Sequence, residues 1–403
     1  MIDKHYRWII VAYTLVIQAV SIGILIYCFA LFVVPWLDTF NAPRRDVMLP
    51  ISILQVVVGL ASPLVGRAMD RYPLRNLVLA GLALLLAGLF LASRATALWQ
   101  IVLVYATLFP VSMALMGTLA AQTLVTRWFP TRRGVAIGIS ATGTNLGGVV
   151  FPLIVAGWLT DVGWRETMLW LGAVSVVLVG PLTWLVLRRE PPGMRPAPGV
   201  APATQRMWTT REILSTRLFW IPGIAIVPLS LAFGAVQYNL GTLSRDIGMS
   251  TDAAANLIAL NAVCMILGKF FFGGVGDRLD HRYIFWMASI LMAISLITLQ
   301  GATDVSTLVT GVVFMGLAGG GMLPFFGVVF GSRFGSVSFG RVMGFAMLTM
   351  TLGSLGPLLA GWTYDLTGSY DLAFQGFASL LLPAAIVMVW LPGPEPEMVV
   401  AVD

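Results

Sequence analysis

Long apolar segments, separated by short polar or basic turns, recur along the whole chain. Each is long enough for a helix to cross a hydrocarbon core of ~30 Å. Backbone N–H and C=O groups must be paired inside lipid, so these segments predict helices, and the alternation typical of a membrane β-barrel is not found. We expect twelve spans, at residues 8–36, 47–69, 74–93, 98–126, 134–160, 165–187, 218–245, 253–276, 282–302, 305–332, 341–364 and 370–391.

Composition places these helices in a membrane. Hydrophobic residues make up 58% of the 403 residues, charged residues only 10%, and mean hydropathy is +0.89. A soluble domain carries roughly 25% charged residues. The only long polar segment, rich in Pro and Arg, lies in the middle. We predict an all-α polytopic membrane protein with an N-terminal six-helix bundle at 1–187, a cytoplasmic linker at 188–217 and a C-terminal six-helix bundle with a short tail at 218–403.

The distribution of basic residues predicts the topology. The N-terminal segment, the linker and every second loop hold most of the Arg and Lys residues, whereas the opposite loops hold few. Because basic residues stay on the cytoplasmic side, both termini are expected in the cytoplasm. The membrane is expected to be a bacterial inner membrane. The net charge of +6 is therefore topological and indicates no nucleic-acid partner. We expect a monomer in the lipid bilayer.

Two pairs of matching segments indicate an internal repeat. GRAMDRYPLR at 66–75 follows span two, and GGVGDRLDHR at 273–282 follows span eight. PLIVAGWLTDVG begins at Pro152 in span five, and PLLAGWTYDLTG begins at Pro357 in span eleven. The order and nearly constant offset of these matches predict two related six-span halves, an organisation common in secondary transporters.

These G-x-x-x-D-R-x-x-x-R loops resemble the signature loop of the major facilitator superfamily. Segments 27–44, 127–139 and 353–370 are similar to its monocarboxylate/oxalate–formate porter branch. The resemblance implies two pseudo-symmetric six-helix bundles, a central substrate site, and charged latches between the bundles at the cytoplasmic end. Ordinary positive-inside loops are the alternative to latches. The expected latch residues are Asp70, Arg71, Arg75, Arg127 and Arg132 in the first half, and Asp277, Arg278, Arg282 and Arg341 in the second.

Small residues in spans five and eleven predict close helix approach or bending. In the resembling family these spans flank the cavity and rock, although simple tight packing would equally account for any single glycine. A proline in such a span also frees a backbone carbonyl and permits a kink. The expected helix-packing residues are Gly143, Gly147, Gly353, Gly356 and Pro357.

One deep charge stands out, Lys269 in span eight. It lies eight residues before Asp277, which corresponds to ~12 Å along a helix and places it near the midplane. Ionisable residues at such depth are functional by default. The resemblance implies a basic residue here, usually Arg, that meets the carboxylate of the substrate. The alternative is that Lys269 snorkels toward the cytoplasm or binds carbonyls of neighbouring helices.

Further polar residues within spans are candidates for lining the cavity: Tyr27, Asn145, Tyr238, Asn239 and Asn261. For each, a hydrogen bond between helices is the alternative role. No Asp or Glu occurs mid-span. Some monocarboxylate porters place an acid one turn before the span-eight basic residue, where this chain has Met265. Protons, if they are the coupling ion, would then act through Lys269 or enter with the substrate, and anion exchange remains open.

Other classes of function lack their motifs. No G-x-x-x-x-G-K-[ST] loop, metal-ligand spacing or nucleophile–base arrangement is found, so we expect no enzyme, cofactor or metal. The sequence predicts a secondary active transporter of a small organic anion, a monocarboxylate, working by proton symport or anion exchange. An exporter of hydrophobic or drug-like compounds is the alternative within transport. A non-transporting membrane receptor or scaffold is the alternative from another class.

Overall fold

The computed structural model describes residues 2–129, 133–188, 208–276 and 279–392. All regular elements in these residues are helical. Within the described ranges, twelve segments are long and apolar enough to cross a membrane, from His5–Phe40 to Asp371–Val389. The predicted all-α class and the predicted number and order of spans are therefore confirmed.

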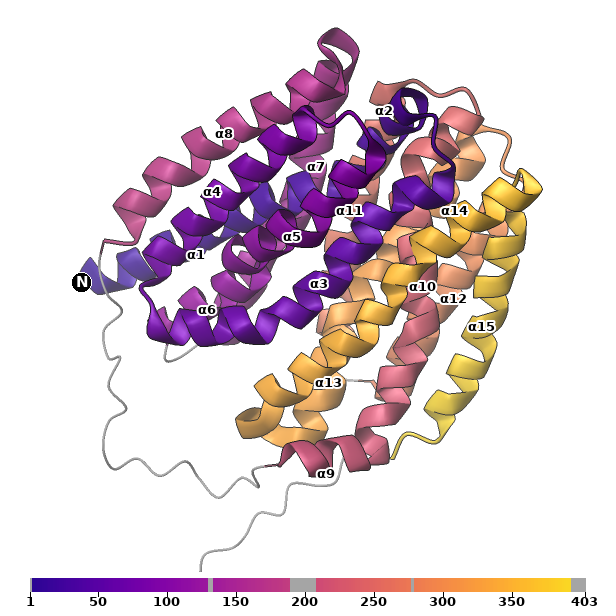
Figure 1. The fold of residues 1–403 in the computed structure, drawn as a ribbon. Coiled ribbons are helices and arrows are strands. Elements are labelled where there is room, and N and C mark those ends of the chain that lie inside the picture. The colour runs from indigo at the N-terminus through magenta and orange to yellow at the C-terminus, as the bar shows by residue number, and fades with distance from the viewer. Residues whose placement is uncertain (1, 130–132, 189–207, 277–278, 393–403) are drawn as a thin grey trace, which may run out of the picture.

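The N-terminal half comprises the first six spans (Figure 1). Span one is built from three consecutive elements, and span four from two helices that meet at Gly117. The remaining spans are single helices. In chain order the elements are α1 (Ile2–Ile22), the π-helical turn η1 (Gly23–Tyr27), α2 (Phe29–Phe40), α3 (Arg44–Arg71), α4 (Leu74–Ser93), α5 (Leu98–Met116), α6 (Thr118–Trp128), α7 (Arg133–Asp161) and α8 (Gly163–Val186).

The C-terminal half comprises the last six spans, preceded by the short helix α9 (Thr210–Ser215). Helix α13 contributes span ten and the start of span eleven, which continues through a 3-10 turn into α14. The elements are α10 (Arg217–Asp246), α11 (Thr251–Gly276), α12 (His281–Leu299), α13 (Val305–Thr351), η2 (Leu352–Ser354), α14 (Leu355–Thr367) and α15 (Asp371–Val389).

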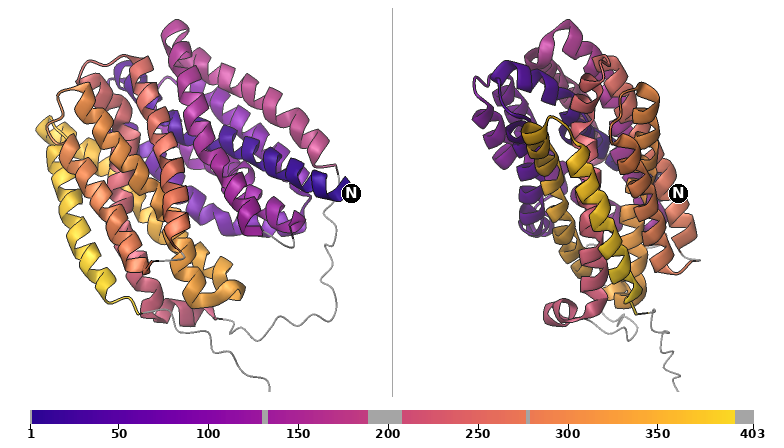
Figure 2. Two further views of the ribbon diagram at one scale, coloured as in Figure 1. Left: turned by 180° about the vertical axis from the view of Figure 1, so that it is seen from behind. Right: turned by 90° about the vertical axis from the view of Figure 1, so that its right-hand side faces the viewer.

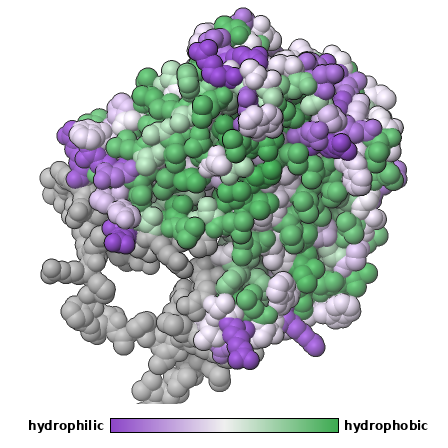
Figure 3. Space-filling view, in the orientation of Figure 1, coloured by the Kyte–Doolittle hydropathy of each residue, from purple (hydrophilic) through white to green (hydrophobic). Residues whose placement is uncertain are grey.

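The outer surface of the bundle is apolar where lipid tails would lie. Figure 3 shows a broad hydrophobic band across the molecule, with hydrophilic residues gathered toward its ends. Large side chains such as Val177, Phe270 and Leu366 are about 70% exposed on this surface. Such exposure is costly in water but is expected in hydrocarbon.

Among the described residues, the two halves meet mainly where α3 packs on α14, α7 on α11 and α2 on α10. We call the end where α1 begins and α8 ends the proximal end, and the end where α2 ends and α3 begins the distal end. In Figures 1 and 2 the halves converge at the distal end and diverge toward the proximal end. Both inter-half ion pairs formed by the described residues lie at the distal end.

The glycines expected to allow close packing lie at tight helix crossings in both halves. A Cβ atom at Gly143 or Gly147 of α7 would lie 2.3 or 2.2 Å from a backbone oxygen of α1. At Gly356 of α14 it would lie 2.1 Å from the Leu231 oxygen of α10, and at Gly353 it would lie 2.4 Å from the Ser230 Cβ. Span one thus packs on span five as span seven packs on span eleven. Side chains larger than hydrogen would force these helices apart.

Pro357 lies at one of these crossings as well. Its ring approaches Gly234 of α10, where an added Cβ would lie 3.3 Å from the Pro357 Cδ. The α13–η2–α14 segment changes from α-helix to a 3-10 turn and back immediately before it. A proline removes one backbone hydrogen bond of the preceding turn, which accounts for this local change in helix type.

Candidate functional site

Lys269 lies on α11 at the contact between the two halves. Its Nζ donates a hydrogen bond of 3.2 Å to Thr144 Oγ1 and a second hydrogen bond to Asn145 Oδ1, both on α7. Met265 lies four residues earlier on α11, so its side chain and that of Lys269 project from one face of the helix. The Lys269 ammonium thus points toward α7 of the opposite half and does not lie along α11.

Asn145 connects Lys269 to Tyr27 of span one. The Asn145 Nδ2 donates to the Tyr27 hydroxyl at 2.9 Å, and that hydroxyl donates to Met265 Sδ at 3.3 Å. Asn145 is fully buried and Tyr27 is 5% exposed. The chain of hydrogen bonds leaves the C-terminal half at Lys269, passes through two N-terminal residues, and returns at Met265. Three of the predicted binding residues are therefore brought together here.

The backbone of span one is adapted to place Tyr27. The Cys28 amide bonds to the Gly23 oxygen at 3.0 Å, which makes a single π-helical turn. Such turns frequently occur at functional sites because the extra residue changes the direction of the following side chains. A Cβ at Gly148 of α7 would lie 2.6 Å from the Tyr27 ring. The ring therefore rests directly on the α7 backbone, one turn after Asn145.

No carboxylate among the described residues pairs with Lys269, whose hydrogen-bond partners are neutral oxygens. Lys269 is half-buried, and an ammonium withdrawn from water without an anionic partner is costly in an apolar interior. The arrangement leaves a positive charge between the halves that a small anion would neutralise. The site is therefore chemically suited to binding a small anion.

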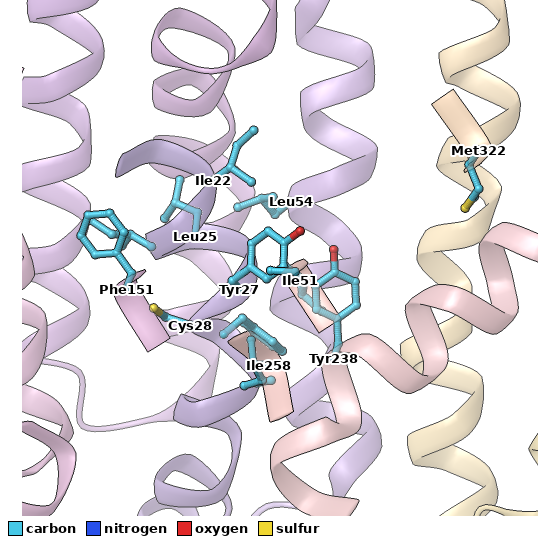
Figure 4. Packing of buried hydrophobic residues seen from close by; sticks show 14 of the residues in the cluster. Ile22, Leu25, Tyr27, Cys28, Ile51, Leu54, Phe151, Tyr238, Ile258 and Met322 are labelled. Atoms are coloured by element: carbon cyan, nitrogen blue, oxygen red, sulfur yellow. The ribbon is translucent and has the colours of Figure 1, made fainter. Parts of the chain in front are cut away.

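Tyr238 lies beside this chain, on α10. Figure 4 shows Tyr238 and Tyr27 among the buried residues of the inter-half region. The Tyr238 ring packs edge-on against Phe29 of α2, with ring centroids 6.0 Å apart. Its ring therefore joins the apolar wall at the α2–α10 contact, and the described residues offer its hydroxyl no hydrogen-bond partner.

Asn261 faces the interior of the C-terminal half. Its Nδ2 donates to Gln237 Oε1 of α10, while Asn261 Oδ1 and Gln237 Nε2 have no partner in the described structure. A Cβ at Gly316 of α13 would lie 2.9 Å from Asn261 Oδ1. Asn261 is thus enclosed by α10 and α13, an arrangement that suits a bond between helices.

Asn239 belongs to a different cluster, at the distal end. Its Oδ1 accepts a hydrogen bond from the Tyr370 hydroxyl at 3.1 Å, and Tyr370 also contacts Thr242 Oγ1 at 2.8 Å. The Arg44 Nη1 of the N-terminal half donates to the same hydroxyl at 2.7 Å. Asn239 therefore supports the inter-half contact of Arg44.

The sequence did not predict the contacts that Arg44 makes with the C-terminal half at the distal end, which we call the distal clamp. Arg44 pairs with Asp246 through two hydrogen bonds of 2.8 and 2.5 Å, and its guanidinium lies 3.5 Å from the Tyr364 ring centroid. Asp365 accepts the backbone N–H groups of Arg44 at 3.0 Å and of Arg45 at 2.9 Å. A signal was present. Two arginines at a helix N-terminus oppose the helix dipole and need nearby acids.

The predicted latch residues at the proximal end have varied partners within their own halves. Arg127 donates to the Met69 oxygen at 2.8 Å, and Arg75 lies 3.3 Å from the Trp184 ring centroid. Arg282 donates to the Leu391 oxygen, and the Arg71 guanidinium lies 5.7 Å from the Tyr72 ring centroid. The side chains of Asp70 and Arg341, and residues Arg132, Asp277 and Arg278, lie outside the described part of the structure.

The described residues contain no group of three or more His, Cys, Asp or Glu side chains placed to hold a metal ion. Cys28 and Cys264 are both free and buried. The half-buried cation between two six-span halves defines the class of site: a polar centre in a helical membrane protein of transporter architecture.

Comparison with known proteins gives the family. The Major Facilitator Superfamily profile matches residues 15–243 and 223–402. The chain belongs to this superfamily, and it is a membrane transporter, not an enzyme. Monocarboxylate transporter 11 of Homo sapiens is 27% identical over 409 residues, covering 98% of this chain and 85% of the relative. Monocarboxylate transporter 13 of Bos taurus is 26% identical, covering 97% and 90%.

A solved structure shares the fold. A bacterial homologue of the human lysosomal transporter Spinster, in an inward-facing and unoccupied conformation, has a TM-score of 0.70 to this chain. The two sequences are 16% identical, and the match covers 96% of this chain and 95% of the other. The likeness confirms the fold in which the site is set.

Proposed function

We propose that this transporter carries a small organic anion, a monocarboxylate, and that Lys269 binds the carboxylate near the midplane. The proposal rests on a half-buried ammonium between the halves whose described partners are all neutral. An anion removes the cost of that charge, whereas a cation would increase it. Relatives named monocarboxylate transporters, which this chain matches over nearly its whole length, support the same substrate class.

Alternating access is the mechanism that suits these contacts. The contacts between the halves come from a few helices of each bundle, so each half can move as a body while the site stays between them. We assign the proximal end to the cytoplasm by the positive-inside rule. The distal clamp would then close the outer side, and the loops holding Asp70 and Asp277 would latch the inner side in the opposite state.

Arg127 supports the inner latch of the first half. It donates to the Met69 carbonyl near the end of α3, directly beside Asp70 in the sequence. A cation at a helix C-terminus is favourable, and it also brings a positive charge to the predicted latch loop. The corresponding loop of the second half holds Arg282, which binds the carbonyl of Leu391.

Uptake into proteoliposomes tests the substrate class. Radiolabelled lactate, pyruvate, formate, oxalate and aromatic acids would be compared with the uncharged amides of the same acids. We expect uptake of at least one monocarboxylate, with its amide neither transported nor inhibitory. Absence of uptake for every acid, with a well-folded protein, would contradict the proposed substrate class. Uptake of cationic or neutral lipophilic compounds instead would favour an exporter.

An imposed pH gradient then separates the two coupling modes. In proton symport, an acid-outside gradient accelerates net uptake of the acid. In anion exchange, uptake depends on acid preloaded in the vesicle and responds little to the gradient. The described carboxylates do not pair with Lys269, so in symport the proton would travel on Lys269 or on the substrate.

A further inference from the structure

The hydrogen-bond chain at the centre of the molecule has one direction only. A lysine ammonium has no acceptor, so the Asn145 atom that faces Lys269 must be the carbonyl oxygen. The amide NH₂ of Asn145 must then face Tyr27, whose hydroxyl accepts it and donates its own proton to Met265. The orientation of the Asn145 amide is thus set at both of its ends.

Asn145 therefore presents to Lys269 the kind of atom that a carboxylate would present. Its Oδ1 is an oxygen on an sp² carbon, with a partial charge where a carboxylate oxygen has a larger negative charge. We propose that Asn145 is a placeholder for the substrate: its amide oxygen occupies the carboxylate position on Lys269 in the empty site, and the anion binds by displacing it. This inference rests on the proposed function of Lys269 as the anion site.

The contact of Asn145 with Lys269 stabilises the empty carrier. Without such a contact, departure of the anion would leave the half-buried ammonium of Lys269 with no oxygen partner, which is costly. Asn145 and Thr144 of the opposite half supply oxygens in its place. The empty carrier can then change state without an anion. The same contact competes with the anion and lowers its affinity.

Tyr27 is a positioning residue in this scheme. It acts on Lys269 through Asn145, because its hydroxyl holds the amide NH₂ and keeps the carbonyl oxygen directed at the ammonium. Loss of the hydroxyl would leave a buried amide donor unpaired and would weaken the placeholder. Asn145 is fully buried, so water cannot easily replace that partner.

The test is the sign of the affinity change in Asn145→Ala. Binding of lactate, pyruvate and benzoate is measured by ligand-dependent thermal shift in detergent. Removal of an internal competitor should lower Kd by about tenfold, the range for a hydrogen bond to a charged group. Tyr27→Phe should change Kd in the same direction but less. The control is Ser140→Ala, because Ser140 is buried on the same helix and bonds Gln18 within the N-terminal half.

Transport kinetics give a second readout that a structural role would not move. In Asn145→Ala, net uptake requires the empty carrier to return with Lys269 bonded to Thr144 alone, whereas exchange does not. Net uptake should therefore fall several-fold relative to exchange against the same internal acid. Equal losses of both rates would contradict the placeholder.

The outcomes separate the inference from the proposed function. Weaker or unchanged binding in both Asn145→Ala and Tyr27→Phe would overturn the placeholder, and weaker binding would make Asn145 a direct substrate ligand. Lys269→Gln is measured in parallel. If that variant binds these acids as wild type does, the anion site itself is wrong and the placeholder falls with it. If only Lys269→Gln loses binding, the proposed function stands and the placeholder alone fails.

Discussion

Arg44 and Asp246 form a two-pronged ion pair between the halves, with N–O distances of 2.8 and 2.5 Å. Their side chains are 12% and 28% exposed, so the pair is partly shielded from water. A second pair, Asp38 with Arg245, also joins the halves at 2.8 Å, but its side chains are 57% and 47% exposed. Shielded, bidentate pairs are the stronger ones, and exposed pairs contribute only about 0–1 kcal/mol. The first pair should therefore dominate closure of the distal end.

Asp246→Asn is expected to open the distal end, while Arg245→Gln should have little effect. Loss of the acid removes the charge that holds Arg44 across the interface. Spin labels at the exposed residues Thr160 and Thr303, in a background without the native cysteines, report the distance between the two halves by double electron–electron resonance. We expect a new population at longer distance in Asp246→Asn alone. Identical distributions in both variants and wild type would show that the Arg44 pair does not hold this end.

Tyr370 links the distal clamp to the buried polar groups of α10. Burial raises the pKa of Tyr370 to about 12, and this effect outweighs the nearby Arg44, which lowers it. The stabilising neutral hydroxyl is thus fully present below the ordinary pKa near 10 and is lost only as the pH rises through about 12. The three hydroxyl contacts should be independent of pH in the physiological range.

Tyr370→Phe should therefore lower Tm in detergent by the same amount at pH 6 and pH 9. The loss leaves the fully buried Asn239 and Thr242 without this partner, which costs about 1–3 kcal/mol. A Tm difference between wild type and Tyr370→Phe that changes between pH 6 and pH 9 would mean that the hydroxyl titrates in this range.

Gly148→Ala should disrupt the central site through Tyr27. The added methyl group would lie 2.6 Å from the Tyr27 ring, and the ring must move away from Asn145. Overpacking of this kind typically costs about 1–3 kcal/mol of stability. We expect uptake of the transported acid to fall about tenfold or more.

Gly138→Ala is the matched control on the same helix. A Cβ at Gly138 meets no atom within 4 Å, and alanine has the higher helix propensity. Uptake near the wild-type rate is expected in this variant. Equal activity of the Gly148 and Gly138 variants would show that the seating of the Tyr27 ring on α7 is not needed for transport.

The spans could be predicted from the sequence because hydropathy is a local property. An apolar run of sufficient length must be helical in lipid wherever it lies in the fold. Lys269 was likewise identifiable, because a charge inside such a run is rare. Both conclusions needed only the residues nearby in the chain.

Partnerships between distant residues could not be predicted in the same way. Whether Lys269 meets Asn145 depends on the rotation of α11 against α7, and Tyr27 reaches Asn145 only because of the π turn at Gly23–Tyr27, which has no sequence signature. Arg44, Asp246 and Asp365 come from three separate spans, and their meeting depends on how the halves dock. Asn239 was chosen as a polar residue within a span, but its hydrogen bond connects it to the distal cluster.

Comparison of Lys269→Gln with Lys269→Arg in the proteoliposome uptake assay tests the anion site most directly. Glutamine keeps a similar length without the charge, and arginine keeps the charge with a different geometry. Uptake of the monocarboxylate should fall roughly 100-fold in Lys269→Gln, as expected for the loss of one partner of a partly desolvated charged pair, and should be partly retained in Lys269→Arg. Wild-type uptake of a monocarboxylate by a correctly folded Lys269→Gln protein would contradict the anion site and leave Lys269 with a structural role.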